Sequence, residues 1–148
     1  MKQLSKPAFG LALFALCQGI ISDATAGGAD SAVVINEIHY HPNDDTGEWI
    51  ELRNLMGVDV DLSGWHFSDG FDYTFPEGAV LPGRGYLVVA ENPSAAAFAG
   101  ITVMGPFSDG GLSNGGEEIE LANRDGRVMD RVDYDDEGLW PVGPDGSG

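Results

Sequence analysis

The feature that most constrains the fold is a series of short β-rich segments, each bounded by residues that favour turns. The chain has 22 glycines and 8 prolines among its 148 residues, and these interrupt every apolar run before a long helix can form. Alternation or enrichment in β-branched and aromatic residues predicts strands at 33–40, 48–54, 58–62, 65–67, 73–75, 86–90, 117–122 and 128–134. About eight short strands separated by turns predict an all-β domain, an antiparallel β-sandwich.

The alternation also predicts which side chains share a face of each strand. Trp49 and Glu51 fall on one face of their strand, opposite Ile50 and Leu52. In the first strand, strict alternation predicts two faces of four residues each. One face carries Val34, Asn36, Ile38 and Tyr40, and the other carries Val33, Ile35, Glu37 and His39.

One strand and one helical segment stand out from this pattern. The strand at 86–90 is the most apolar and is therefore expected at the centre of a sheet. The only helical signal is at 93–98, with Asn92 as a cap, Pro93 at the first position and Gly100 as a stop. One or two helical turns are expected there.

The N-terminal residues 1–26 are predicted to be a secretory signal peptide. Two lysines precede an apolar run at 8–21, and Ala24-Thr25-Ala26 has the small-x-small pattern of a cleavage site. The apolar run is too short and too interrupted to span a membrane. We expect cleavage after Ala26, no membrane insertion of the mature chain, and a secreted, cell-surface or periplasmic location.

Cleavage would also remove Cys17, the only cysteine of the chain. The residue before it, Leu16, is not small, so a lipid anchor is not expected. Disulfides, thiol catalysis and cysteine-zinc sites are then excluded for the mature protein. The expected organisation is a signal peptide at 1–26, a mobile leader at 27–32 and one domain at 33–148.

The charge of the chain argues against a nucleic-acid partner. Seven basic residues face 24 acidic ones, a net charge of −17, whereas phosphate binding requires clustered cations. The mature chain retains five arginines and 23 acids, a net charge of −18. Three arginines fall near one predicted hairpin but alternate with acids, in the order Arg124, Asp125, Arg127, Asp130, Arg131 and Asp133. We expect no nucleic-acid partner.

An ordered set of motifs covering roughly 33–146 resembles the lamin tail domain family. The matching segments are Val34-Ile-Asn-Glu-Ile38, Glu48-Trp-Ile-Glu-Leu-Arg-Asn54, Val60-Asp-Leu-Ser-Gly-Trp65, Tyr73-Thr-Phe-Pro76, Leu81-Pro-Gly-Arg-Gly-Tyr-Leu-Val-Val-Ala90, Leu112-Ser-Asn-Gly-Gly-Glu117, Asp125-Gly-Arg-Val-Met-Asp130 and Trp140-Pro141. The resemblance implies an immunoglobulin-like antiparallel β-sandwich. Together with the signal peptide it implies a bacterial-type secreted member: a non-catalytic binding or adhesion module of a larger multidomain protein. The expected partner is an extracellular protein or polysaccharide.

The chain departs from the family pattern at its C-terminal side. The family usually continues beyond the Trp140-Pro141 region with one more apolar strand, whereas this sequence stops at Gly148. We therefore expect either a sandwich that lacks its last strand or a piece of a longer protein. A missing strand would leave an exposed sheet edge.

Acidic residues near the C-terminal side form the candidate metal site. Carboxylates in loops are hard oxygen ligands that suit Ca²⁺. Four acidic residues lie at the end of the last predicted strand and just after it: Asp133, Asp135, Asp136 and Glu137. The spacing is not that of an EF-hand. The alternative is a solvated acidic surface that keeps the protein soluble. No cofactor other than calcium is expected.

An enzymatic alternative depends on two patterns. Gly111-Leu-Ser113-Asn-Gly115 fits the G-x-S-x-G motif, but that motif requires a strand-to-helix elbow and a strand is predicted to follow here. His39 and His41 could bind zinc with Glu37 if they share a strand face. The alternative function is a small secreted metal-dependent hydrolase, or an accessory domain of a secreted nuclease or phosphoesterase.

The aromatic residues allow a carbohydrate-stacking platform or a hydrophobic core. The set comprises Trp49, Trp65, Phe67, Phe71, Tyr73, Phe75 and Trp140. Most are expected in the core of a small sandwich. Phe71, at the tip of a predicted hairpin, is the one expected to be exposed.

Overall fold

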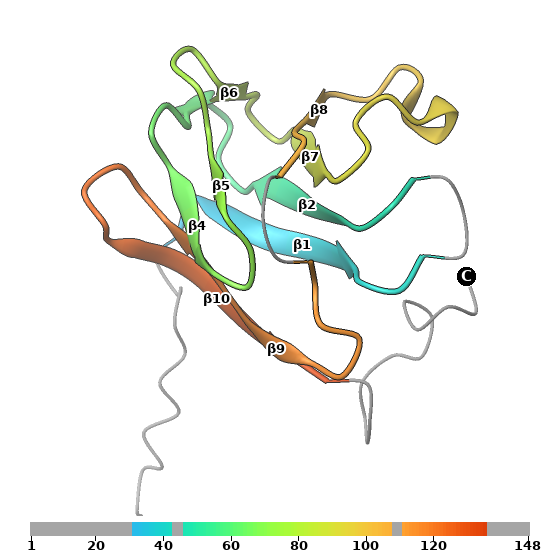
Figure 1. Cartoon of the computed structure of the whole chain (residues 1–148). Coiled ribbons are helices and arrows are strands. Elements are labelled where there is room, and N and C mark those ends of the chain that lie inside the picture. Colours follow the sequence, from blue (N-terminus) through green and yellow to red (C-terminus); the bar gives the residue numbers. More distant parts are fainter. Residues whose placement is uncertain (1–30, 43–45, 108–110, 136–148) are drawn as a thin grey trace, which may run out of the picture.

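The computed structural model describes residues 31–42, 46–107 and 111–135. Within these ranges the chain forms ten strands and one 3₁₀ turn (Figure 1). In chain order these are β1 (Val33–His39), β2 (Trp49–Asn54), β3 (Val60–Asp61), β4 (His66–Asp69), β5 (Tyr73–Thr74), β6 (Val80–Leu81), β7 (Tyr86–Ala90), η1 (Ala96–Phe98), β8 (Val103–Met104), β9 (Glu117–Ala122) and β10 (Val128–Tyr134). Each of the eight predicted strands has a counterpart.

The strands form two four-stranded sheets that pack as a sandwich (Figure 1). One sheet has the order β1-β2-β7-β8, and the other has the order β10-β9-β4-β5. The short strands β3 and β6 pair separately with each other. The predicted all-β sandwich is confirmed, and β7 lies inside its sheet between β2 and β8 as expected.

The sequence did not predict β6 and β8. Each has only two residues, too few to show a period-2 pattern. Strand β8 also pairs parallel to β7, while the other strand pairs described are antiparallel. The purely antiparallel expectation is therefore wrong at this edge, because the segment at 91–102 carries the chain back before β8 begins.

A β-bulge in β1 changes which residues face the core. Ile35 pairs with Leu52 and Glu37 pairs with Glu51, so Asn36 has no opposing residue on β2. Val33 and Ile38, predicted on opposite faces, are both buried. The strict alternation predicted for 33–40 is wrong because a bulge adds one residue and reverses the phase.

The core between the two sheets is rich in aromatic rings. Phe71 is only 4% exposed, and its ring lies 4.4 Å from Phe67 and 4.5 Å from Phe107, centroid to centroid. The prediction that Phe71 is exposed is therefore wrong. Gly70, with a φ of 91°, turns the chain so that the next side chain points inward.

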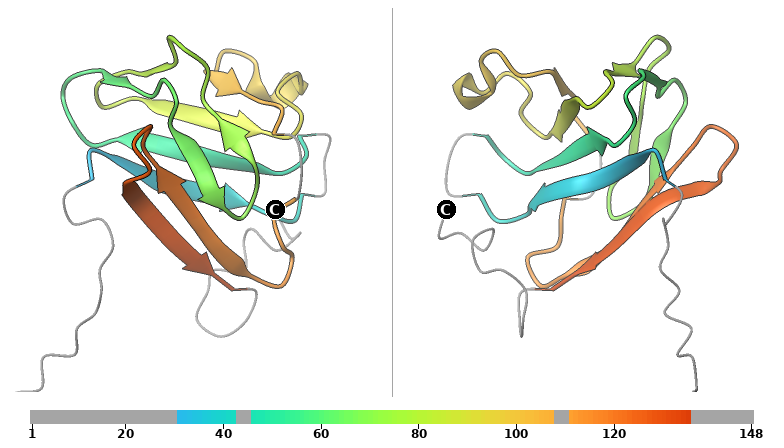
Figure 2. Two further views of the ribbon diagram at one scale, coloured as in Figure 1. Left: turned by 60° about the vertical axis from the view of Figure 1, so that its left-hand side comes forward. Right: turned by 180° about the vertical axis from the view of Figure 1, so that it is seen from behind.

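The predicted helical segment is one 3₁₀ turn, shorter than 93–98. It begins at Ala96, because Ala95 has an extended ψ of 140°, and no side chain caps the turn. The helical character is confirmed, but the capping by Asn92 is wrong. The connection between β7 and β8 that contains η1 lies at one side of the molecule, beyond these two strands (Figure 2).

Candidate binding groove

The outward face of the β1-β2-β7 sheet is organised in cross-strand rows. Antiparallel pairing with a period of two residues places alternate side chains of β2 on this face. From the end nearest η1, the rows are His39, Trp49 and Ala90; then Glu37, Glu51 and Val88; then Arg53 and Tyr86. The predicted opposition of Trp49 and Glu51 to Ile50 and Leu52 is confirmed.

An aromatic cluster occupies the first row. The His39 ring stacks on the Trp49 indole, with centroids 5.0 Å apart and planes 24° apart. Phe98 of η1 meets the same indole edge-on, at 6.4 Å and 89°. This small cluster, which includes Val88 and Ala90, is separate from the core between the sheets. The connection at 91–102 thus buries Val88 on a face that would otherwise be open.

A groove lies between this connection and the sheet. Its volume is about 280 Å³, and it is lined by His39, Thr46, Trp49, Glu51, Val88, Ala97, Phe98 and Ile101. Ile101 is 50% exposed at its wall. Ligand sites for drug-sized molecules start at roughly 300 Å³. The groove therefore suits one side chain or one small ring.

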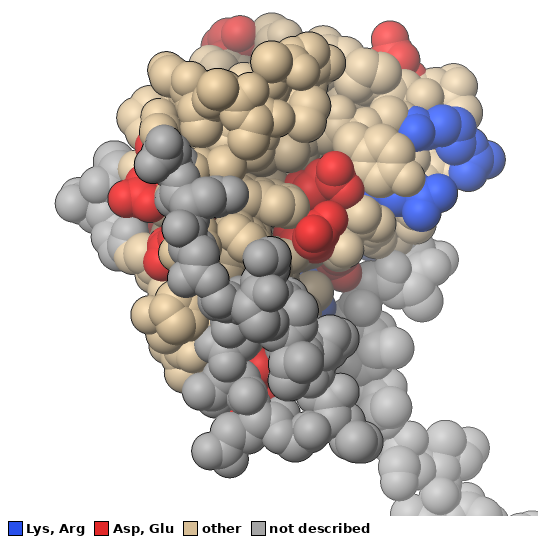
Figure 3. Space-filling view, turned by 90° about the vertical axis from the view of Figure 1, so that its right-hand side faces the viewer, with Lys and Arg blue, Asp and Glu red and all other residues tan. Residues whose placement is uncertain are grey.

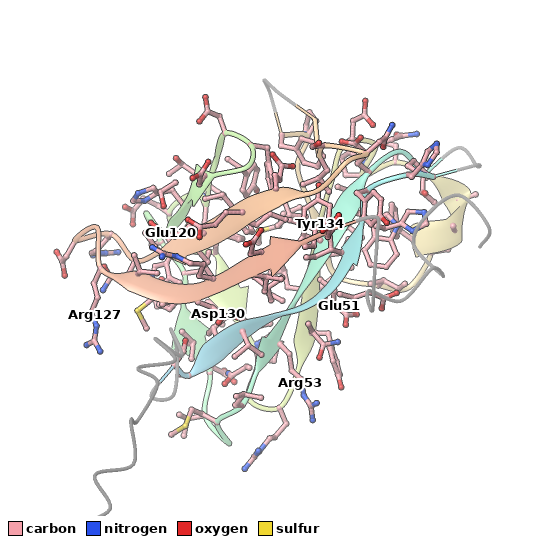
Figure 4. The ribbon with its side chains drawn as sticks, turned by 90° about the horizontal axis from the view of Figure 1, so that it is seen from below. Glu51, Arg53, Glu120, Arg127, Asp130 and Tyr134 are labelled. Atoms are coloured by element: carbon pink, nitrogen blue, oxygen red, sulfur yellow. The ribbon has the colours of Figure 1, made fainter. Side chains whose placement is uncertain are left out.

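The second row supplies the charge of the groove. Glu37 and Glu51 are directly opposite each other in the register, and Asn36 donates from Nδ2 to Glu51 Oε1 at 2.7 Å. Arg53, one row further, places its guanidinium 5.5 Å from the centroid of the Tyr86 ring and points away from the sandwich (Figure 4). On the right-hand side of the molecule as drawn in Figure 1, acidic side chains gather near the centre of the view, apart from a basic group at its edge (Figure 3).

A second hollow of about 490 Å³ lies on the other sheet and is mainly polar. Its lining comprises His66, Phe67, Asp72, Tyr73, Thr74 and Pro106. Burial raises the pKa of the Tyr73 phenol, and a hydrogen bond with the Gly105 backbone acts in the opposite direction. The first groove is the better candidate, since an apolar floor with few converging polar groups is typical of binding sites.

A carboxylate contact that the sequence did not predict joins segment 111–113 to Glu48, the residue before β2. Glu48 Oε2 accepts a hydrogen bond from the Leu112 backbone N–H at 2.6 Å. Burial raises the pKa of Glu48, the bond from Leu112 opposes this rise, and the charges of Glu91 and Glu117 add to it. The partners lie far apart in sequence, so no local motif could have revealed the contact.

The serine of the G-x-S-x-G motif belongs to a turn that leads into β9. The Ser113 N–H donates to Glu117 Oε1 at 2.7 Å, and the Ser113 Oγ accepts from the Gly115 N–H at 3.2 Å. The Tyr134 hydroxyl lies 2.7 Å from the Ser113 carbonyl oxygen and 2.9 Å from Glu117 Oε1. Burial, followed by the bond to Glu117, raises the pKa of Tyr134 far above its usual value. A strand follows this turn, so it is not the strand-to-helix elbow that the hydrolase motif requires.

The metal-ligand predictions have different outcomes. In residues 31–42, 46–107 and 111–135, no group of three or more His, Cys, Asp or Glu could hold a metal ion. The predicted zinc ligands His39, His41 and Glu37 are among the described residues and form no such group. The His39 ring stacks on the Trp49 indole instead.

The calcium site falls largely at the limit of the described chain. Asp133 is exposed on β10 and Asp135 follows it, whereas Asp136 and Glu137 lie outside the described residues. Calcium binding stays a prediction. Equal melting temperatures in EDTA and in millimolar Ca²⁺ would contradict it.

The aromatic residues divide between the core and the groove. Trp65, Phe67, Phe71 and Phe75 are buried in the core, as expected for most of the set. Tyr73 is partly buried and packs against the same core. Trp49 packs in the separate small cluster, and Trp140 lies outside the described residues. The alternation of β2 was the signal that placed Trp49 on the outer face.

Two of the hairpin arginines are engaged by neighbouring groups. Arg131 binds Glu120 and lies 3.5 Å from Glu118. Arg124 donates from Nε and Nη2 to the Ser63 carbonyl oxygen at 3.1 and 2.9 Å. The absence of a nucleic-acid partner stays a prediction, consistent with these contacts.

The two packed sheets and their order define an immunoglobulin-like β-sandwich domain. The chain belongs to the lamin tail domain family, since the family described as Lamin Tail Domain matches residues 27–136. A comparison with curated proteins finds none that matches the chain. Within the part of the chain that the structure describes, no helix is sufficiently long and apolar to cross a membrane.

Proposed function

We propose that this chain is a non-catalytic binding domain of a bacterial-type secreted protein, and that the groove beside Trp49 is its ligand site. The observation that carries the proposal is the groove itself: an apolar floor, a stacked His39–Trp49 pair and the carboxylate of Glu51 meet on an outer sheet face. Such a combination recognises a ligand without performing chemistry on it. The ligand is an extracellular protein or polysaccharide.

The N-terminal sequence supports export. Its basic start, short apolar run and Ala24-Thr25-Ala26 site are the features that signal peptidases read. Expression of the full chain in a bacterial host is expected to yield a product outside the cytoplasm that begins at Gly27. An uncleaved cytoplasmic product would contradict this part of the proposal.

The larger protein context is a separate part of the proposal. Lamin tail domains are small sandwich modules, and the resemblance described above implies a module within a larger multidomain protein. Sequencing the gene beyond the Gly148 codon and measuring the intact mass of the secreted product would test it. A reading frame that continues into another domain is expected, and a product of about 122 residues (Gly27 to Gly148) would contradict it.

Binding is tested most directly at Trp49. Its indole is partly exposed, whereas the Trp65 indole is buried, at 8% exposure. Peptide and oligosaccharide panels are therefore expected to shift the Nε1–H resonance of Trp49, and Trp49→Ala is expected to abolish binding. A matched control is Val128→Ala, which removes an exposed apolar side chain on β10. Binding that survives Trp49→Ala would place the ligand elsewhere.

A further inference from the structure

We propose that the groove receives a lysine or arginine side chain from a basic protein partner, with its cationic group between Glu37 and Glu51. This inference rests on the proposed function as a binding domain and names the chemistry of its ligand. The shape, the charge and the aromatic geometry of the groove all favour this occupant.

The shape fits a long, unbranched side chain. The floor and walls are apolar, from Trp49, Val88, Phe98 and Ile101, and the only acid that lines the groove is Glu51. Lysine and arginine carry an aliphatic stem that packs along apolar surface while the charged end stays near water. A volume of about 280 Å³ accommodates one such side chain and little more.

The charge arrangement favours a cation. Like charges directly opposite each other on neighbouring strands destabilise a sheet, and Glu37 and Glu51 occupy such positions. Among the described residues, no lysine or arginine forms an ion pair with either carboxylate, because Arg53 lies over Tyr86 instead. The Asn36 amide holds only one oxygen of Glu51. A cation placed beside Glu37 and Glu51 would give both carboxylates an ionic partner.

The aromatic geometry disfavours the polysaccharide alternative. A sugar ring stacks on a free aromatic face, but His39 already covers one face of the Trp49 indole and Phe98 meets the indole edge-on. A neutral sugar would also leave the Glu37 and Glu51 carboxylates without an ionic partner. The net charge of −18 of the chain from Gly27 further increases the rate at which basic partners encounter the protein.

The test uses the chain from Gly27 to Gly148 and synthetic peptides as probes. One peptide has a single central lysine between glycines, with blocked ends; matched peptides carry arginine, citrulline or norleucine at that position. Titrations are followed by the Trp49 indole and Glu51 amide resonances in EDTA. The lysine and arginine peptides are expected to bind at least about fivefold more tightly than norleucine and citrulline.

Two double variants separate local charge from net charge. Glu37→Gln with Glu51→Gln is expected to weaken binding of the lysine peptide about fivefold or more. Glu77→Gln with Asp125→Asn removes the same charge from exposed loop residues and is expected to leave binding nearly unchanged. The first variant should fold, since Glu37 is exposed and Glu51 is only half-buried, and its amide spectrum checks this.

The outcomes distinguish the inference from the proposed function. If the norleucine peptide binds as tightly as the lysine peptide, the cationic occupant is wrong while the groove remains a binding site. The same conclusion follows if the Trp49 indole resonance shifts only with hexasaccharides of xylan, cellulose or chitin. Equal loss of binding in both double variants would also overturn the inference. If no peptide or oligosaccharide shifts the groove resonances, the inference and the groove as a binding site both fail.

Discussion

Asp130 of β10 accepts a hydrogen bond at its Oδ2 from the backbone N–H of Ile35, at 2.7 Å, and so joins the two sheets of the sandwich. Ile35 lies in the edge strand β1, immediately before the bulge at Asn36, and Asp130 follows a register shift in β10. Figure 4 shows Asp130 in the space between these two strands. An edge strand with free backbone groups is open to pairing with another chain, and this contact closes it at one point.

Asp130→Ala is expected to destabilise the sandwich by about 1–3 kcal/mol, because the Ile35 N–H loses a charged acceptor. Urea unfolding measures the loss, and hydrogen exchange at the Ile35 amide should accelerate. Asp133→Ala, an exposed carboxylate on the same strand, is the matched control in EDTA. Unchanged exchange at Ile35 would show that the bond has no protective role.

Asn54 is a buried junction between β2 and the following loops. Its Nδ2 donates to the carbonyl oxygens of Val58 at 2.8 Å, and of Leu81 and Pro82 at 3.1 Å each. Its Oδ1 accepts from the Met56 N–H at 2.8 Å. The side chain is 0% exposed, so water cannot readily replace these partners.

Asn54→Ala is therefore expected to cost about 2–4 kcal/mol, since several buried backbone groups lose their partner. The matched control is Asn123→Ala in the β9–β10 turn, where Asn123 Oδ1 accepts from the N–H groups of Asp125 and Arg127 near the surface. Its expected cost is about 0.5–1.5 kcal/mol. Equal losses in denaturant unfolding would mean that burial does not set the difference.

Glu48 is expected to make the protein less stable as pH rises through the acidic range. Burial raises its pKa in the folded state, whereas an unfolded glutamate titrates near about 4.3. Its favourable contribution is thus complete below that pH and is lost as pH rises through the folded-state pKa. Glu48→Gln keeps an acceptor for the Leu112 N–H but removes this loss.

The measurement is the difference in unfolding free energy between Glu48→Gln and the unaltered chain, which cancels most other titrations. The difference should move in favour of glutamine as pH rises above about 4.3, the usual pKa of a glutamate. Glu91→Gln removes one neighbouring charge and is expected to bring the pKa of Glu48 closer to its usual value, as followed by carboxyl ¹³C shifts. A difference that is constant with pH would contradict the prediction.

Gly116 is expected to tolerate no side chain. Its φ is +92°, and a Cβ there would lie 2.6 Å from the Tyr134 carbonyl oxygen. Gly116→Ala should cost about 2–4 kcal/mol through strain and displacement of the β10 backbone. Gly78→Ala is the control, because Gly78 also has a positive φ of +82° but nothing within 4 Å of its Cβ position. Its expected cost is about 1 kcal/mol, and equal melting temperatures for the two variants would refute the clash.

The sequence determined the local features of this protein. Alternation in β2 placed Trp49 and Glu51 opposite Ile50 and Leu52, because a strand has a side-chain period of two. The apolar run at 86–90 marked a strand inside a sheet. Turn residues separated the strands, and the ordered motifs indicated the family. Each of these signals lies within a few neighbouring residues.

The tertiary structure decided what joins distant parts of the chain. The bulge at Asn36, the burial of Phe71 and the parallel pairing of β8 depend on partners that no local pattern specifies. The groove likewise forms only when the connection containing Phe98 packs over Trp49. The physical reason is that period-2 patterning fixes the two faces of a strand, while long-range packing fixes its neighbours, its register and what covers its outer face.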